Sequence, residues 1–296
     1  MDLEFEKLTL DCIETLRPFF VDNACRINDC TVGGTFLWRD FHGTGYAIED
    51  GVLYLKVSYP EIGFAPPIGA PLGKESFNRI IEYCAGKGDP VRFCSVSEAL
   101  LARILDMFPG SSVRSDRACC DYLYLSNDIA ELSGRRYAGQ RNHINRFTRE
   151  HPLWSFERIT ADNIGDARAF MEENARINAR DSLTYIEGNR KALEVLNNLE
   201  KYGLFGGVLY VNGEAAGISL GEIMDDTLFI HIEKADTRYH GSYQMLMNQF
   251  ARCFVTGTTS YINREEDDGD DGLRTSKLSY HPVALLDKYT VEIVAE

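Results

Sequence analysis

The sequence of 296 residues has no long hydrophobic run and too few basic residues to balance its acidic ones. No uninterrupted stretch of about 18 apolar residues occurs, so no membrane-spanning helix is expected. The first ten residues, MDLEFEKLTL, carry acidic side chains where a secretory signal has a basic region. Lys and Arg number 31 against 45 Asp and Glu, and the net charge of −14 excludes broad, non-specific binding to nucleic acid or anionic membrane. We expect a cytoplasmic protein without stable membrane insertion.

Several motifs of metal and hydrolase sites are incomplete. The eight cysteines contain no CxxC pair and no framework spacing, so we expect reduced, mostly buried thiols and no metal site. His231-Ile232-Glu233 resembles the HxE of zinc deaminases, but the PCxxC that completes such a site is missing. Gly217–Gly221 matches the GxSxG elbow of hydrolases, although strands are predicted on both sides of it, where an elbow runs from strand into helix. Neither motif receives a catalytic role.

The composition is that of a globular protein in which short β-rich runs alternate with helical patterns. Hydrophobic residues make up 44% and charged residues 26% of the chain, which is ordinary for a folded soluble protein. The alternation indicates an α/β or α+β fold. In the first half, the patterns predict helices over Leu10–Phe20 and Glu75–Ala85, and a third helix that is capped by Ser97 and runs to about Phe108. Strands are predicted over Tyr46–Ile48, Val52–Val57, Val91–Cys94 and Asp121–Leu125, and a loop over Ile62–Gly73.

A basic helix follows from about Gly134 to Arg149 and ends at His151-Pro152, because the residue before proline is forced out of helical geometry. We place a lobe boundary there, with an N-terminal lobe over 1–152 that includes this helix and a C-terminal lobe over 153–296. In the second lobe the patterns predict helices over Ala161–Ala179, Glu187–Tyr202 and Tyr243–Val255, strands over Phe205–Val211, Ala215–Ile223, Thr227–Lys234 and Ser260–Asn263, and hairpin turns at Asn212-Gly213 and Asp225-Asp226. Two helices, a three-stranded meander, a glycine turn, a helix and a strand form the order found in GNAT-fold acyltransferases.

The glycine turn before the last of these helices is a candidate donor-binding site. Amide groups at a helix N-terminus attract phosphate, and glycine lets the backbone approach closely. In GNAT enzymes this loop, Q/R-x-x-G-x-G/A, cradles the pyrophosphate of the acyl donor. Arg238 and Gly241 match the first two fixed positions, and Tyr243 stands where the last small residue belongs. Arg238, Gly241, Ser242 and Tyr243 are therefore donor-binding candidates, and an ordinary strand-to-helix turn is the alternative.

The basic helix and an acidic segment stand out by charge. Arg141, His143 and Arg146 belong to a helix in which Arg141, Asn145 and Arg149 lie four residues apart on one face, with Arg146 on the adjoining stripe. Such a face suits the phosphate of an RNA acceptor end, a coenzyme or a lipid headgroup. These arginines could equally pair with acidic residues of the other lobe. From Glu265 to Asp271 six carboxylates crowd the end of a predicted strand, and their repulsion needs a cationic ligand, an internal Arg or Lys, or a metal to offset it. A solvated acidic loop is the simpler explanation of this run.

The segment Asn263 to Pro282, NREEDDGDDGLRTSKLSYHP, resembles the region near the end of the catalytic domain of phosphatidylglycerol lysyltransferases and their bacterial relatives. The matching residues are Asn263, Glu265, Asp267, Gly269, Gly272-Leu273-Arg274, Lys277, Ser279-Tyr280 and Pro282. The same relatives carry a basic stretch that is similar to Tyr137–Phe147, YAGQRNHINRF. Two motifs in the expected order extend the resemblance across most of the chain.

This resemblance implies two tandem GNAT-like lobes, each a mixed, largely antiparallel sheet flanked by helices, shared more distantly with Fem-type peptidoglycan aminoacyltransferases. It implies transfer of an acyl or aminoacyl group from aminoacyl-tRNA or acyl-coenzyme A to an amine or hydroxyl of a lipid, peptide or small molecule, with no further cofactor. Two alternatives stay open, a non-catalytic ligand-binding protein on the same fold and an RNA-binding module.

A transferase of this kind must deprotonate its acceptor and stabilise an oxyanion, and the family segment supplies candidates for both tasks. As a hypothesis, Glu265 or Asp267 orients or deprotonates an amino group, and Tyr280 donates a proton to the leaving group. Arg274 and Lys277 balance negative charge on the donor or the intermediate. Asn263 completes the candidate binding residues of this segment.

Overall fold

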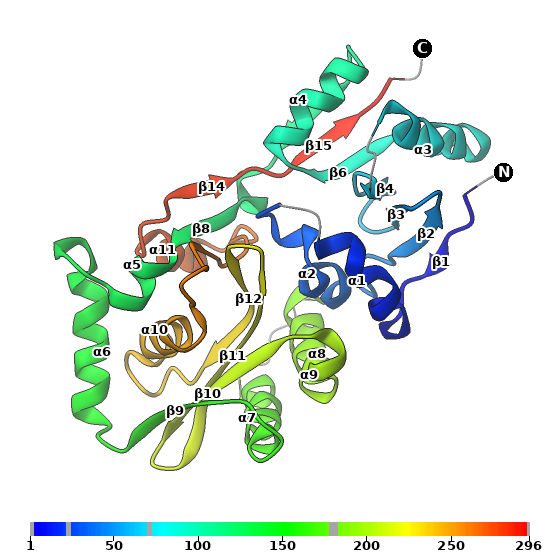
Figure 1. The fold of residues 1–296 in the computed structure, drawn as a ribbon. Coiled ribbons are helices and arrows are strands. Elements are labelled where there is room, and N and C mark those ends of the chain that lie inside the picture. Colours follow the sequence, from blue (N-terminus) through cyan, green and yellow to red (C-terminus); the bar gives the residue numbers. More distant parts are fainter. Residues whose placement is uncertain (1–2, 22–24, 70–72, 178–182, 295–296) are drawn as a thin grey trace. The chain divides into compact units, whose positions relative to one another are not determined.

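The computed structural model of the protein describes residues 3–21, 25–69, 73–177 and 183–294 (Figure 1). The chain forms two compact units, one of residues 1–121, 266–270 and 285–296, the other of residues 122–265 and 271–284. The predicted basic helix thus belongs to the second unit, whereas the division of the chain into two acyltransferase-like lobes at residue 152 stays a prediction. Within the described residues, no helix has both the length and the apolar character needed to cross a membrane.

The first unit is built on a mixed sheet that has eight strands within the described residues, in the order β1-β2-β3-β4-β6-β15-β7, with β5 paired to β3. The strands are β1 (Glu6–Lys7), β2 (Gly45–Glu49), β3 (Val52–Val57), β4 (Gly63–Phe64), β5 (Ile68–Gly69), β6 (Arg92–Val96), β7 (Ser112–Ser115) and β15 (Tyr289–Glu292). The turn Asp50-Gly51 has positive φ at both residues, which is the geometry of a two-residue hairpin. β4 and β5 lie inside the segment predicted as a loop, because β3 and β6 offer backbone partners to short pieces that have no strand pattern of their own.

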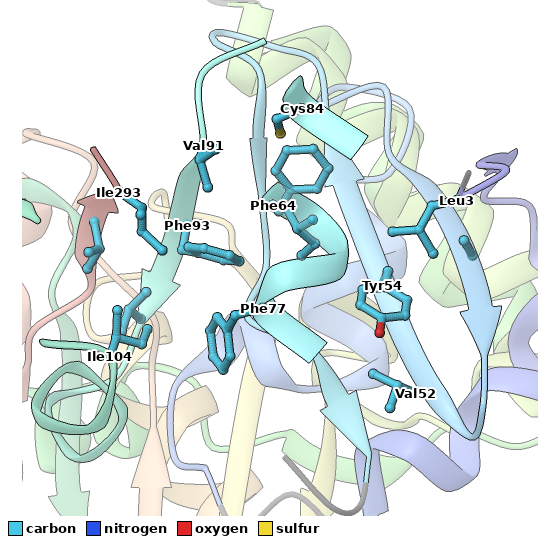
Figure 2. Close-up of a cluster of buried hydrophobic side chains, with 14 residues drawn as sticks. Leu3, Val52, Tyr54, Phe64, Phe77, Cys84, Val91, Phe93, Ile104 and Ile293 are labelled. Carbon is cyan, nitrogen blue, oxygen red and sulfur yellow. The ribbon is translucent and has the colours of Figure 1, made fainter. Parts of the chain in front are cut away.

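Helix α3 (Lys74–Lys87) packs its apolar side onto this sheet. Phe77 of α3 meets Phe93 of β6 with ring centroids 5.1 Å apart, and Phe64 lies in the same core (Figure 2). Burying each such side chain stabilises the unit by roughly 1.5–3 kcal/mol. The other helices are α1 (Ile13–Val21), α2 (Val32–Leu37), α4 (Glu98–Met107) and 3-10 turns at Leu10–Cys12, Asn28–Cys30 and Arg117–Cys119. The predicted cap of α4 is confirmed, since Ser97 Oγ accepts from the amide of Leu100.

The second unit is built on a sheet whose strand order is β14-β8-β13-β12-β11-β10-β9 within the described chain. The strands are β8 (Asp121–Leu125), β9 (Trp154–Arg158), β10 (Phe205–Val211), β11 (Glu214–Met224), β12 (Thr227–Ala235), β13 (Tyr261–Asn263) and β14 (Ala284–Leu286). The predicted meander of β10, β11 and β12 is confirmed, with turns at Asn212-Gly213 and Asp225-Asp226. β13 runs parallel to β12 because the chain returns to the sheet through α10.

Helices cover the two faces of this sheet (Figure 1). They are α5 (Ser126–Glu131), α6 (Ala138–Glu150), α7 (Ile164–Ile177), α8 (Leu183–Asn197), α9 (Leu199–Tyr202), α10 (Ser242–Phe254) and α11 (Asp271–Leu278), with a 3-10 turn at Arg135–Tyr137. α10 buries Leu246 and Phe250 against one face, and α7 lies against β11 from the other. α6 stops at Glu150, as predicted from His151-Pro152, and the predicted end of α7 near Ala179 lies outside the described residues.

Candidate functional site

A sharp corner at the end of β13 brings two charged side chains to β12. β13 pairs with β12 only along Thr227–Phe229. The next residues, Arg264 and Glu265, leave the sheet, and Glu265 adopts the left-handed conformation with φ +57°. Asn263 Oδ1 accepts from the Glu265 amide at 2.6 Å, and Lys277 Nζ donates to the carbonyls of Arg264 at 2.5 Å and Glu265 at 3.1 Å. The predicted site residues Asn263 and Lys277 thus fix the backbone of this corner.

Glu265 reaches a buried histidine on β12. His231 Nδ1 lies 3.0 Å from Glu265 Oε1, and its Nε2 lies 3.0 Å from Glu222 Oε1 of β11. Burial, the largest single influence, lowers the pKa of His231, but hydrogen bonds to both carboxylates and their charges outweigh it and raise the pKa to about 9. The imidazole is therefore cationic at neutral pH. Glu265 is the most open of the three, with 17% of its side chain exposed against none of His231.

A β-bulge gives His231 this position. Leu220 pairs with Ile232 and the next residue, Gly221, pairs with Ile230, so His231 is the extra residue on β12. Such a bulge disturbs the ladder locally and re-aims the side chain of the inserted residue. The His231 ring stacks near Phe229 at an interplanar angle of 11°. A regular strand would have paired His231 within the ladder.

A second charged pair lies two residues along β12. Arg264 Nη2 donates to Glu233 Oε1 at 2.8 Å. The Arg264 guanidinium lies over the ring of Tyr280 at 5.0 Å and near that of Tyr124 at 6.0 Å. Burial raises the pKa of the Tyr280 phenol, although Arg264 opposes this, so Tyr280 keeps its proton at neutral pH. The predicted residue Tyr280 is thereby part of the wall around Arg264.

Not all predicted residues of the acidic segment lie in the second unit. Asp267 belongs to the first unit, where it is fully buried, contacts Arg117 at 3.1 Å and accepts from the amide of Gly269. Arg274 lies in α11 of the second unit, 3.6 Å from Asp271. Glu265, Lys277 and Tyr280 are therefore connected through Arg264, whereas Asp267 has a separate counter-ion in the other unit.

The predicted binding residues of α6 contact their own unit. Arg141 donates to the carbonyls of Leu132 and Gly134, where the chain leaves α5. Arg146 contacts Glu150 at 2.8 Å on an exposed helix face. The Arg141 contacts hold the connection between α5 and α6, and Arg146 belongs to a surface ion pair of the common i, i+4 type.

The predicted phosphate turn before α10 is closely packed. Gly241 has φ +87°, and a Cβ at this position would lie 2.5 Å from the carbonyl oxygen of His143 in α6. Arg238 forms a two-point contact with Asp236, with Nη2 2.6 Å from Oδ2, and Ser242 Oγ donates to the Asp236 carbonyl. The partial negative charge of the His143 carbonyl therefore already lies at the positive end of α10.

Two further predicted residues flank this turn. His143 Nδ1 and His240 Nε2 are 3.0 Å apart and form a hydrogen bond in which the nitrogen that carries the proton is the donor. Burial and the charge of His240 lower the pKa of His143. Tyr243 lies in the first turn of α10 and is partly exposed. Among the described residues, no three His, Cys, Asp or Glu side chains are arranged to hold a metal ion.

Sequence reasoning missed the polar residues of β11 and β12. His231 and Glu233 were visible as an HxE pattern, but only as an incomplete zinc motif. The signal that identifies them is the alternation of ionisable side chains within an otherwise buried apolar strand, since buried charges require partners. Glu222 and Arg264 gave no comparable pattern, since Glu222 is a single ionisable residue among apolar neighbours and Arg264 opens a run of charged residues.

The first unit contains its own charge cluster around a buried lysine. Lys288 Nζ lies 2.7 Å from Asp29 Oδ2, 2.7 Å from Asp121 Oδ1 and 2.8 Å from Glu266 Oε2. One ammonium does not neutralise three carboxylates, and burial raises the pKa of Asp121, the most enclosed of them. The pKa of Lys288 is raised because these carboxylates outweigh the cost of its burial.

The model of the family described as "Phosphatidylglycerol lysyltransferase, C-terminal" matches residues 26–292. The chain belongs to this family. The crystal structure of a conserved protein from Bacteroides thetaiotaomicron is 32% identical, with a TM-score of 0.92 over 99% of this chain and 100% of that one. L-PGS from Bacillus licheniformis shares 16% identity with a TM-score of 0.65 over 94% and 91% of the two chains, and FemX shares 10% with a TM-score of 0.55 over 99% and 98%.

A protein of Mycoplasmoides gallisepticum is 24% identical over 189 residues, which are 59% of this chain and 56% of that protein. The chain thus matches about half of the length of this relative. The predicted family and the predicted fold class, two helix-flanked sheets of the tandem GNAT type, are confirmed. Family and fold support an acyl or aminoacyl transferase of the lysyltransferase and Fem type.

Proposed function

We propose that this protein transfers an aminoacyl group from tRNA to an amine or hydroxyl acceptor, with Glu265 as the proton acceptor. The observation that carries the proposal is the Glu222–His231–Glu265 group beside the Glu233–Arg264 pair, where the corner after β13 meets β12. A carboxylate that is partly open and held in place by a buried cation is suited to take a proton from an incoming acceptor. The identity of donor, acceptor and catalytic residues belongs to this proposal.

The reaction needs one proton to move. The acceptor amine or hydroxyl loses its proton to the Glu265 carboxylate as its lone pair attacks the ester carbonyl. The tetrahedral intermediate then collapses, the bond to the terminal ribose oxygen breaks, and this oxygen takes the proton. His231 stays protonated and holds Glu265, and Glu222 offsets the charge of His231 on its other side. His231 and Glu222 are positioning residues in this scheme.

Two predicted roles change in the light of the contacts. Lys277 donates to two backbone carbonyls, so we assign it the positioning of Arg264 and Glu265. Tyr280 packs its ring on Arg264 and keeps its proton, so we assign it the support of the guanidinium. Arg264 is the cation of this region that can stabilise the oxyanion, because guanidinium N–H groups suit a developing negative oxygen.

The turn before α10 favours tRNA over coenzyme A as the donor. A coenzyme A pyrophosphate needs the open helix terminus and a free arginine, and here the His143 carbonyl lies against Gly241 while Asp236 binds Arg238. The exposed face of α6 carries Arg149 beside the Arg146–Glu150 pair and offers a phosphate contact for an RNA end. An acidic protein with such a local basic surface would bind tRNA in a strongly salt-dependent way.

The test offers the purified protein tRNA charged with labelled amino acids, or labelled acetyl-coenzyme A, together with phosphatidylglycerol vesicles, short peptides and free amines. We expect label to move from tRNA and not from acetyl-coenzyme A. Glu265→Gln should lower kcat by about 100- to 10,000-fold, the usual contribution of a general base. Glu214→Gln, an exposed glutamate at the start of β11, is the matched control and should retain full activity.

Equal turnover by Glu265→Gln and wild type would reject Glu265 as the base. Transfer from acetyl-coenzyme A alone would reject the donor assignment. If aminoacyl-tRNA binds but no acceptor receives label, the protein is a ligand-binding member of the family, and the transferase proposal fails.

A further inference from the structure

Several buried polar atoms of the second unit have no hydrogen-bond partner within the described part of the chain, and three of them lie on β11, on β12 and just after β13. They are Ser219 Oγ, Glu233 Oε2 and Arg264 Nη1. Ser219 is fully buried, and Arg264 is 9% exposed. Buried polar groups nearly always have partners, so three such atoms require an explanation.

One of the three atoms is an oxygen of the Glu233 carboxylate, and the other two belong to residues beside it. Ser219 of β11 lies directly opposite Glu233 of β12, and residues opposite each other in an antiparallel pair point to the same face. Arg264 Nη2 already donates to the other oxygen of Glu233 at 2.8 Å. The cluster therefore offers one carboxylate oxygen, one guanidinium N–H group and one hydroxyl on the same side of the sheet. β12 pairs with β13 only up to Phe229, so the cluster lies beyond the paired part of these two strands.

The surrounding contacts hold Arg264 in this arrangement. Tyr280 and Tyr124 pack on its guanidinium, and Tyr124 Oη donates to the carbonyl of Lys277 at 2.9 Å. Lys277 in turn donates to the Arg264 carbonyl. Because both ends of Arg264 are fixed, the free N–H group does not swing to a new partner without disturbing this wall.

The chemistry of the cluster selects its ligand. An anion would be repelled by Glu233, and a simple cation would be repelled by Arg264. A ligand satisfies both when its donor group faces the carboxylate and an acceptor oxygen three bonds from that donor faces the guanidinium. An α-amino ester has this pattern, with its ammonium as donor and its carbonyl as acceptor. An acetyl thioester has the carbonyl alone.

We infer that Glu233 and Arg264, with Ser219, select donors that carry a free α-amino group. This inference rests on the proposed aminoacyl transfer and adds its specificity-determining residues. Glu233 Oε2 binds the α-ammonium, Arg264 Nη1 binds the ester carbonyl, and Ser219 completes the contacts of the ammonium. The same Arg264 contact then aligns the carbonyl for attack.

Binding is measured by calorimetry on the full chain, with L-alaninamide and L-lysinamide as unreactive probes and their N-acetyl forms as blocked counterparts. Wild type should bind the free amides at least about tenfold more tightly than the blocked ones, the effect of a good hydrogen bond to a charged group. Glu233→Gln should abolish this preference, and Ser219→Ala, which keeps the ion pair intact, should reduce it. Glu214→Gln should leave it unchanged.

Equal binding of free and blocked amides would overturn the inference, as would failure of both amides to bind, which would leave the cluster as a site for buried water. If Glu233→Gln does not fold, Ser219→Ala decides. If Glu233→Gln and Ser219→Ala both transfer the aminoacyl group from tRNA as fast as wild type, the inference is overturned while the proposed function stands. Amide binding that depends on Glu233, without transfer to any acceptor, would support the inference and reject the transferase.

Discussion

Replacing His231 with glutamine tests whether this side chain is held as a cation between Glu222 and Glu265. Glutamine has a similar length and keeps a hydrogen-bond donor, but it carries no charge. The pKa of His231 is raised from 6.5 to about 9 in the folded protein. At about 1.4 kcal/mol per pKa unit, this corresponds to about 3 kcal/mol of stability.

The direction of the pH dependence follows from the raised pKa. A histidine with a higher pKa in the folded state stabilises the fold fully below the unfolded value of 6.5. This contribution is lost as the pH rises through about 9. The difference in the free energy of unfolding between wild type and His231→Gln should therefore shrink by about 3 kcal/mol between pH 6 and pH 10.

Urea unfolding followed by tryptophan fluorescence measures this difference in the second unit alone. The chain has two tryptophans, and Trp38→Phe in every protein leaves Trp154 of β9 as the reporter. Groups common to both proteins cancel in the difference. His281→Gln, an exposed histidine of the same unit, serves as control and should run parallel to wild type. If wild type and His231→Gln also run parallel from pH 6 to pH 10, His231 is not held as a cation and the reasoning fails.

Three other substitutions test separate contacts. Lys288→Met leaves three carboxylates without their cation, so the free energy of unfolding at pH 7.5 should fall by about 3–5 kcal/mol, measured by urea unfolding with Trp38 as reporter. Part of this loss should be recovered toward pH 5 as the carboxyl groups protonate. An unchanged unfolding midpoint would contradict the cluster. Gly241→Ala places a Cβ 2.5 Å from the His143 carbonyl at positive φ and should lower stability by about 1–3 kcal/mol, whereas a neutral effect would mean that α6 does not pack on this turn. Lys277→Met leaves the Arg264 carbonyl without this donor at a cost of about 1–3 kcal/mol, while the Glu265 carbonyl keeps the Tyr122 amide, and a loss below about 1 kcal/mol would remove its positioning role.

Local signals predicted the elements whose partners are neighbours in sequence. The β10–β12 meander was predictable because Asn212-Gly213 and Asp225-Asp226 each join strands that pair directly with each other. The end of α6 was predictable from Pro152, since proline acts on the residue next to it. The family segment predicted Glu265, Lys277 and Tyr280 as neighbours of one region, and these three residues do meet through Arg264.

Elements that depend on distant partners were not predictable. β15 is only four residues long and becomes a strand because it lies between β6 and β7, which come from another part of the chain. β4 and β5 arise in the same way within a segment of turn residues. The bulge at His231 depends on a shift of register between β11 and β12, which no periodicity within either strand reveals.

The acidic segment separates what the sequence determined from what the tertiary structure decided. The sequence determined the family, the helix-flanked fold and the need to offset a run of like charges. The tertiary structure supplied three different counter-ions for three consecutive residues: Glu265 binds His231, Glu266 binds Lys288 and Asp267 binds Arg117. These partners lie 34, 22 and 150 residues away in sequence. Coulomb interactions depend on distance in space, so only folding showed which carboxylates balance structural charges and which one belongs to the candidate site.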